Sequence, residues 1–195
     1  MSAKIRVKTL SRTALFTALI IVGGFIRIPI GAVPITLQTI FVLLSGALCG
    51  KKVGFLAPLI YLLLGLVGLP IFSAGGGIAY VLYPTFGYIV GFVFAGFIVG
   101  IPKKCGVAKR IIFNLLGVSV IHVVGVLYFY FTSNAYLQVA DAMYTQIANA
   151  PIYSGAEISL WQAILTGSLV FLPVDIISAI ISALTAQKLY PIINR

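Results

Sequence analysis

The sequence predicts an all-α membrane protein, a bundle of six transmembrane helices that forms a single domain over residues 1–195. Hydrophobic residues make up 61% of the chain and charged residues only 8%, and the mean hydropathy is +1.16. These values lie far outside the range of soluble domains. A chain of 195 residues suffices for six spans of about 20 residues each with their connections. The expected environment is a lipid bilayer.

Prolines and charged clusters divide the apolar sequence into the six expected spans. In chain order these are residues 10–28 (closed by Pro29), 36–49, 53–69 (closed by Pro70), 85–101 (closed by Pro102), 111–132 and 160–187 (bent at Pro173). The second span is too short to cross about 30 Å of hydrocarbon alone. We therefore expect residues 28–35 to enter the protein at membrane depth, where irregular backbone is tolerated if it lines a cavity. Residues 133–159 are expected to form a short amphipathic helix at the outer surface.

The positive charges predict the orientation of the bundle. All 13 Lys and Arg residues except Arg27 lie at the two termini or in the second and fourth connections. By the positive-inside rule, both termini and these two connections are cytoplasmic. The same dispersion argues against a nucleic-acid partner despite the net charge of +10, because a nucleic-acid reader gathers its cations on one folded face. The first apolar run lacks a cleavage pattern and is expected to remain as a helix.

Asp175 lies in the middle of the apolar run 165–184, in a chain with only three acidic residues. A carboxylate at membrane depth is costly and usually marks a functional site facing the bundle interior. The alternative is a structural, protonated aspartate that bonds to a neighbouring helix.

His122 and Arg27 are the other ionisable groups at membrane depth. We expect His122 to hydrogen-bond across helices, with substrate contact as the alternative. A metal site is not expected, because no second histidine and no nearby cysteine accompany it. The spacing of Arg27, His122 and Asp175 indicates no catalytic dyad or triad, so an enzyme is not expected.

A glycine run in the third connection is the second candidate element of a site. Gly75, Gly76 and Gly77 precede a series of aromatic residues. Successive glycines let a backbone approach a small ligand closely or move as a lid. The alternative is an ordinary outer loop.

A series of short motifs runs along essentially the whole chain. They are Val-Pro-Ile-Thr-Leu-Gln-Thr at 33–39, Gly-Leu-Val-Gly-Leu-Pro-Ile-Phe at 65–72, the glycine run, Pro-Thr-Phe-Gly-Tyr-Ile-Val-Gly-Phe at 84–92 and Leu-Pro-Val-Asp at 172–175. In this order they resemble the BioY family, the biotin S components of energy-coupling factor vitamin transporters. An S component is the substrate-binding membrane subunit of such a transporter.

The resemblance implies that the single domain binds biotin from outside, in a bacterial-type cytoplasmic membrane. It further implies delivery by association with a transmembrane coupling protein and two cytoplasmic ATPases. The chain carries no Gly-x-x-x-x-Gly-Lys-Ser/Thr phosphate loop, so no cofactor is expected on it and the partners are expected to use the ATP. Ala14 and Ala18 form a small-xxx-small pair that permits close helix packing, and the resemblance assigns them to docking of the coupling protein.

Within this resemblance, Asp175 is expected to accept hydrogen bonds from the ureido N–H groups of biotin, because a carboxylate offers only acceptors. Arg27 is expected to attract or pair with the ligand carboxylate; alternatively it snorkels to the lipid headgroups. The other expected substrate-binding residues are Thr36, Gln38, Gly75, Gly76, Gly77, Tyr88 and Ser178.

Two positions depart from the family pattern. Ser178 stands where a lysine usually follows the aspartate by one helical turn, and Phe86 replaces a glycine. An aromatic wall at Phe86 is expected to narrow the pocket, which leaves lipoate as the alternative ligand. A self-sufficient secondary carrier is the alternative transport class, although such carriers usually have broken helices in both halves.

Overall fold

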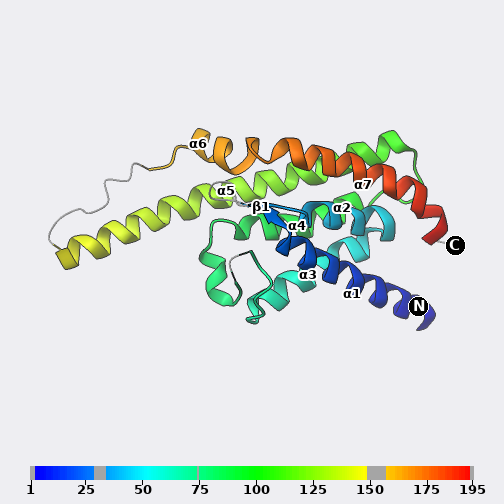
Figure 1. The fold of residues 1–195 in the computed structure, drawn as a ribbon, viewed down its shortest axis with the longest axis horizontal. Coiled ribbons are helices and arrows are strands. Elements are labelled where there is room, and N and C mark those ends of the chain that lie inside the picture. The colour runs from blue at the N-terminus through cyan, green and yellow to red at the C-terminus, as the bar shows by residue number, and fades with distance from the viewer. Residues whose placement is uncertain (1–2, 29–33, 74, 149–156, 194–195) are drawn as a thin grey trace.

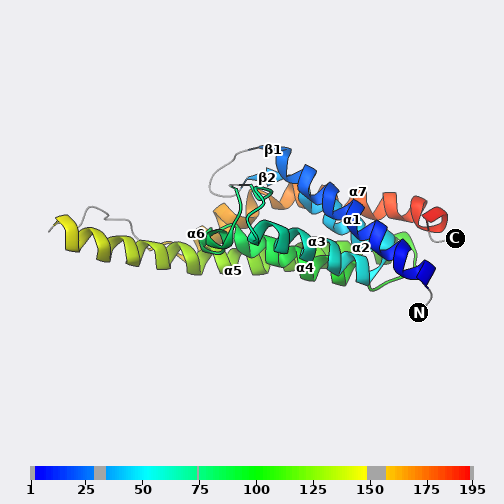
Figure 2. The same ribbon diagram turned by 90° about the horizontal axis from the view of Figure 1, so that it is seen from below.

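The structure, a computed structural model, describes residues 3–28, 34–73, 75–148 and 157–193, with side chains for 7–28, 34–73, 75–135 and 157–193. The elements in chain order are α1 (Ala3–Phe25), β1 (Arg27–Ile28), β2 (Ile35–Thr36), α2 (Gln38–Cys49), α3 (Lys51–Leu66), the short 3₁₀ helix η1 (Ile78–Leu82), α4 (Phe86–Val99), α5 (Val107–Ala148), α6 (Leu160–Ile164), the π-helical segment η2 (Leu165–Leu169) and α7 (Leu172–Ile193). Helices α5 and α7 run along the long axis of the molecule and α1 lies at a slant to them (Figure 1), and the start of α1 and the end of α7 lie at the same end of the bundle (Figure 2). The predicted all-α character is confirmed.

Three helices of the described ranges are long and apolar enough to cross a membrane. They are the Val7–Phe25 part of α1, the Val107–Ala135 part of α5, and α7. The helices α2 and α4 are apolar but shorter. The chain is therefore a helical protein with membrane-spanning segments.

The first span ends earlier than predicted. Helix α1 stops at Phe25 instead of residue 28, because β1 pairs antiparallel with β2, with Arg27 opposite Thr36 and Ile28 opposite Ile35. The predicted entry of residues 28–35 into the protein falls largely on 29–33, which lie outside the described residues. The small hairpin brings the start of α2 back against the end of α1.

The last span differs from the predicted single helix over 160–187 bent at Pro173. It consists of α6, η2 and α7, and the interruption at Val170 and Phe171 precedes the proline. Pro173 instead lies in the first turn of α7, where its missing N–H costs no helical hydrogen bond. Helix α7 then continues to Ile193.

The fifth helix is longer than predicted. A separate amphipathic helix was expected within 133–159, but α5 continues unbroken to Ala148 and projects beyond the other helices (Figure 1). The Asn134 amide joins this part to the start of the last span: its Nδ2 donates to the carbonyl of Ile158 at 3.1 Å, and the Ile158 N–H donates to its Oδ1 at 2.9 Å.

Glycines allow α2, α3 and α4 to meet backbone to backbone. A Cβ added at Gly96 would lie 2.0 Å from the carbonyl oxygen of Gly54, and one added at Gly46 would lie 2.4 Å from that of Gly96. Any larger side chain would force these helices apart. Such close approach through small residues is a usual way for membrane helices to associate.

Arg110 links several helices at the end of the bundle where α1 starts and α7 ends. It is only 3% exposed, and it donates to the carbonyl of Ala47 at 2.8 Å, to Gln187 Oε1 at 2.9 Å and to the carbonyl of Lys103 at 3.2 Å. Its guanidinium also lies over the ring of Tyr190, 4.6 Å from the centroid. This residue therefore ties α2 and α7, both of which contribute to the pocket described next, to the start of α5.

Candidate functional site

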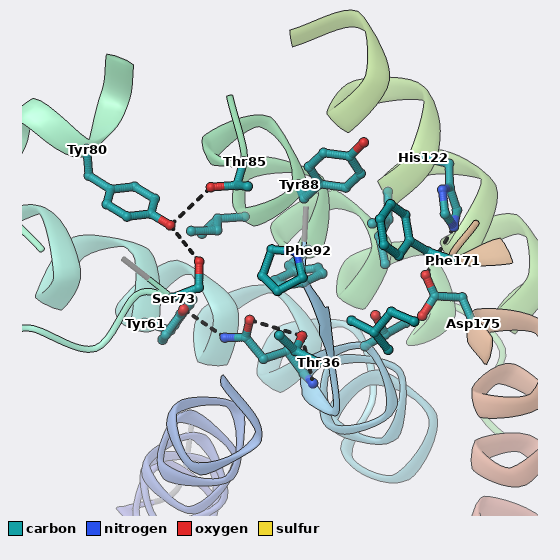
Figure 3. A pocket seen from close by; sticks show the side chains of 16 residues that line it. Thr36, Tyr61, Ser73, Tyr80, Thr85, Tyr88, Phe92, His122, Phe171 and Asp175 are labelled. Atoms are coloured by element: carbon teal, nitrogen blue, oxygen red, sulfur yellow. Dashed lines mark hydrogen bonds and ion pairs between the residues drawn. The ribbon is translucent and has the colours of Figure 1, made fainter. Parts of the chain in front are cut away.

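A pocket lies where β2, α2, α3, α4, α5 and α7 converge with the connection between α3 and α4 (Figure 3). Its volume is about 610 Å³, including its opening to solvent. The lining residues are Pro34, Ile35, Thr36, Gln38, Thr39, Tyr61, Ser73, Tyr80, Thr85, Tyr88, Ile89, Phe92, Ile121, His122, Phe171 and Asp175. The pocket is thus mainly aromatic and aliphatic, with a smaller number of polar groups at both ends and along the α2 side, as in most small-molecule sites.

Asp175 and His122 form an ion pair or hydrogen bond at one end of the pocket. His122 Nε2 lies 3.0 Å from Asp175 Oδ2, and the two side chains are only 8% and 13% exposed. The other ring nitrogen, Nδ1, lies 2.9 Å from the hydroxyl of Ser168. Three helical segments, α5, η2 and α7, are therefore linked through one imidazole ring.

The π-helical segment positions Ser168 for this contact. Its backbone is held from α4, because the hydroxyl of Tyr88 donates to the carbonyl of Gly167. π-Helical turns are rare and occur frequently at functional sites, since they re-aim side chains within a helix. Directly after this segment, the helix is interrupted at Val170 and Phe171. The side chain of Phe171 also lines the pocket.

Gln38 organises the side of the pocket formed by α2. It is 5% exposed, and its amide Nε2 lies 2.7 Å from the hydroxyl of Tyr61 and 3.3 Å from the carbonyl of Ile20. Thr36 lies next to it, with its hydroxyl 3.4 Å from both Gln38 Oε1 and the Gln38 backbone N–H. The network fixes the Gln38 side chain between α1 and α3.

A second polar group lies at the end of the pocket opposite Asp175 (Figure 3). The hydroxyl of Tyr80 lies 2.9 Å from that of Ser73 and 3.0 Å from that of Thr85. Hydroxyls both donate and accept hydrogen bonds. This trio can therefore bind either a carbonyl or a carboxylate.

The structure brings four of the predicted site residues to the pocket. They are Thr36, Gln38, Tyr88 and Asp175. Ser178 lies one turn after Asp175 on α7 and is buried, but it is not among the lining residues. The pocket wall that continues from Asp175 is instead formed by Phe171.

The glycine run shapes the loop beside the pocket and does not itself line it. Gly75 and Gly77 have φ angles of 121° and 99°, which side-chain-bearing residues rarely adopt. A Cβ added at Gly76 would lie 2.1 Å from the carbonyl oxygen of Leu69, and the Gly77 N–H donates to the carbonyl of Gly65 at 2.7 Å. These glycines fold the connection back onto α3, which places Ser73 and Tyr80 in the pocket wall.

Arg27 lies at the rim, outside the lining. Its side chain is exposed, and Nη1 donates to the carbonyl oxygen of Ser73. With Phe72 and Gly75, among others, it lines a second hollow next to the pocket. Ser73 belongs to both hollows, so the guanidinium contacts the backbone of one member of the polar trio.

The structure confirms the expected hydrogen bond of His122 across helices and corrects the expectation for Phe86. The partner of His122 is Asp175 on α7, a pairing that the sequence spacing did not indicate. Phe86 packs against Tyr128, with ring centroids 5.7 Å apart, and is not in the pocket lining, so the expected aromatic wall is absent there. Within the described ranges, no group of three His, Cys, Asp or Glu side chains forms a metal site.

Sequence reasoning also missed Ser168 and Tyr61, and it noted Tyr80 only as one of the aromatic residues after the glycine run. Each is a polar side chain within or beside an apolar run, which is the signal that drew attention to Asp175. For Tyr61 the cue is strong, because a tyrosine buried in a membrane helix normally finds a partner for its hydroxyl.

Comparison with known proteins gives one consistent result. The BioY family model matches residues 1–195. A probable biotin transporter BioY of Lysinibacillus sphaericus is 39% identical over 184 residues, which cover 92% of this chain and 85% of the relative. The biotin transporter BioY of Thermotoga maritima is 36% identical and is matched over 95% of its length by 93% of this chain.

The fold also matches a solved structure. The crystal structure of the S-component for biotin from an ECF-type ABC transporter superposes with a TM-score of 0.78 at 31% identity, and the match covers 97% of this chain and 94% of that one. With the family model matched along the whole sequence, the chain belongs to the BioY family.

Proposed function

We propose that this chain is the S component of an energy-coupling factor transporter and that it captures biotin for ATP-driven uptake by partner subunits. It is a transporter subunit and not an enzyme. The observation that carries the proposal is the pocket with a buried carboxylate, Asp175, in a chain whose family relatives are biotin transporters. The exposure of Asp175 is low enough that a hydrogen bond from a ligand N–H would be made largely away from water.

The polarity of the pocket supports one orientation of biotin. The ureido ring would lie at Asp175, whose Oδ1 accepts an N–H, because His122 already engages Oδ2. The apolar faces of the ring system would pack against Tyr88, Phe92 and Phe171. The carboxylate would point to the trio formed by Ser73, Tyr80 and Thr85, with the guanidinium of Arg27 beyond it.

Six spans with cytoplasmic termini are the topology we propose. In this arrangement α1 to α5 are the first five spans, and α6, η2 and α7 together are the sixth. The positions of both chain ends at the same end of the bundle support an even number of crossings (Figure 2). The distribution of Lys and Arg supports a cytoplasmic position for that end, and the bacterial cytoplasmic membrane is the proposed location.

The proposed partners are a transmembrane coupling protein and two cytoplasmic ATPases. Ala14 and Ala18 are exposed on one face of α1, with Leu15 beside them. A stripe of small residues on a free helix face lets a second membrane helix approach closely. This face is the proposed docking surface.

Calorimetry on the purified full-length chain tests the binding proposal. Biotin is expected to bind, and Asp175→Asn is expected to weaken binding about ten- to hundredfold, because a hydrogen bond to a charged group contributes about 1.5–3 kcal/mol. Lipoate has no ureido donors and is expected to bind weakly. Tight lipoate binding without a biotin signal would contradict the proposal, and robust biotin uptake by this chain alone in liposomes would favour a secondary carrier.

A further inference from the structure

The inference concerns His122 and rests on the proposed biotin site. We propose that His122 is a positioning residue for ligand binding: together with Ser168 it holds Asp175 so that one carboxylate oxygen is engaged and the other is presented to a neutral N–H donor of the ligand. His122 thereby sets the preference of the pocket for a neutral ring over a cationic one.

The geometry around the imidazole carries the proposal. Ser168 Oγ lies 2.9 Å from Nδ1, and Asp175 Oδ2 lies 3.0 Å from Nε2. Both ring nitrogens are thus used, so the ring cannot turn without losing one of the two contacts. All three side chains come from different helical segments, and the Asp175 carboxylate is therefore held from outside its own helix.

This chain of contacts supports Asp175 as an acceptor in either protonation state of the histidine. Nε2–H donates to the carboxylate in the imidazolium and in one neutral tautomer, and the Ser168 hydroxyl accepts from Nδ1–H in the first case and donates to Nδ1 in the second. The hydroxyl can rotate to suit both. Asp175 Oδ1, which His122 does not engage, can then accept from a ligand.

The hydrogen-bond partner of Asp175 comes from α5, not from α7. The residue one turn after Asp175 on its own helix is the neutral Ser178. Among the side chains that the structure describes, His122 is the ion-pair partner of Asp175. A buried carboxylate that loses its partner is strongly destabilised, and a positively charged ligand would then relieve it better than a neutral one.

Two ligands can distinguish a pocket that prefers a neutral ring from one that prefers a cationic ring. Biotin carries a neutral urea, whereas 2-iminobiotin carries a guanidinium in the same place. Calorimetry on the full-length protein would compare both ligands in the wild type, His122→Leu, His122→Gln and Ser168→Ala, with Ser119→Ala as the control. Ser119 is exposed on α5 and bonds within its own helix to Leu115.

The expected result is a change of selectivity, not a general loss. His122→Leu should weaken biotin binding about ten- to hundredfold and weaken 2-iminobiotin binding at least tenfold less. His122→Gln keeps an N–H donor and should stay within about threefold of the wild type. Ser168→Ala should fall between the two, and Ser119→Ala should match the wild type.

A double-mutant cycle with Asp175→Asn completes the test, because a residue that acts through Asp175 should lose its effect when Asp175 is changed. His122→Leu should then alter biotin affinity by less than about twofold in the Asp175→Asn background. Equal losses for both ligands, or equal losses in both backgrounds, would overturn the inference. If His122→Leu does not fold, Ser168→Ala tests the same change of selectivity, with His122→Gln as the variant that retains the N–H donor.

The outcomes for the two proposals differ. Failure of the wild-type protein to bind biotin overturns the proposed function itself, and the inference falls with it. Wild-type binding of biotin together with unchanged binding and selectivity in His122→Leu overturns only the role of His122.

Discussion

The hydroxyl of Tyr88 donates a hydrogen bond to the carbonyl oxygen of Gly167, which lies 79 residues later in the chain. This contact holds the π-helical segment η2 against α4 and so supports Ser168, the neighbour of Gly167 that bonds to His122. Close packing accompanies it, because a Cβ at Gly125 would lie 2.3 Å from the Tyr88 ring. The hydrogen bond therefore connects one pocket wall with the residues that hold Asp175.

The first prediction follows from this contact. Tyr88→Phe keeps the ring but removes the donor, and we expect biotin affinity to fall about three- to tenfold, since one neutral hydrogen bond contributes about 0.5–1.5 kcal/mol. Calorimetry measures the effect. Tyr130→Phe, outside the pocket lining, is the control, and an unchanged affinity in Tyr88→Phe would show that the contact does not support the site.

Gln38 gives a second prediction, on stability as well as binding. Gln38→Leu has a similar volume, but it removes the 2.7 Å donor to the hydroxyl of Tyr61 and leaves this hydroxyl with the longer, 3.4 Å contact to the carbonyl of Ile71. Burying a polar group without its hydrogen bond costs about 1–3 kcal/mol. We expect a lower melting midpoint in detergent and weaker biotin binding.

The partner variant makes that prediction specific. In the Tyr61→Phe background the hydroxyl is already gone, so Gln38→Leu should cost measurably less stability than it does alone. Additive losses would mean that the two side chains do not act as a pair.

The closely packed glycines give the third prediction. Gly96→Ala places a Cβ 2.0 Å from the carbonyl oxygen of Gly54, and separating two helix backbones costs about 1–3 kcal/mol or more. We expect a clear loss of thermal stability, measured by differential scanning fluorimetry. Gly106→Ala is the matched control, because nothing lies within 4 Å of the Cβ added there; similar losses in the two variants would contradict this account.

The sequence predicted where the apolar helices lie, although not all of their ends, and it did not predict the pairing of side chains between them. The expected span 85–101 corresponds to α4 (Phe86–Val99), because an apolar run with a terminal proline specifies a membrane helix almost without tertiary information. The break in the last span was predicted at Pro173, but it precedes this residue. A proline is easily accommodated in a first helical turn, whereas the π-helical turn depends on contacts from α4.

The same distinction applies to the site. Asp175 could be identified from the sequence because a carboxylate within an apolar membrane segment is costly and usually functional. Only the residues next to it in the sequence are needed to recognise this. Its partner His122 is 53 residues away, and no helical period connects the two. For Ser178 the local spacing was misleading. It predicted a pocket residue one turn after Asp175 on α7, but the pocket lining continues instead through Phe171, one turn before Asp175.

The fourth prediction concerns the outer face of α1. Ala18→Leu fills a small-residue stripe that is exposed in this chain, so the fold and biotin binding should be unchanged. Copurification of a coupling protein and its ATPases should fall at least tenfold, since close helix contact would be blocked. Ala135→Leu, on an exposed position of α5, is the size-matched control; retained copurification in Ala18→Leu would exclude this face as the docking surface.

The fifth prediction addresses Arg27. Only part of its guanidinium is used at Ser73, and arginine carries five N–H donors, so it can still pair with a carboxylate at the rim. We expect Arg27→Ala to weaken biotin binding about three- to tenfold, as for an exposed charge-assisted contact, and to leave binding of biotin methyl ester unchanged. If the ester and the acid lose affinity equally, Arg27 acts by holding the loop at Ser73, and if neither changes, the guanidinium has no part in binding.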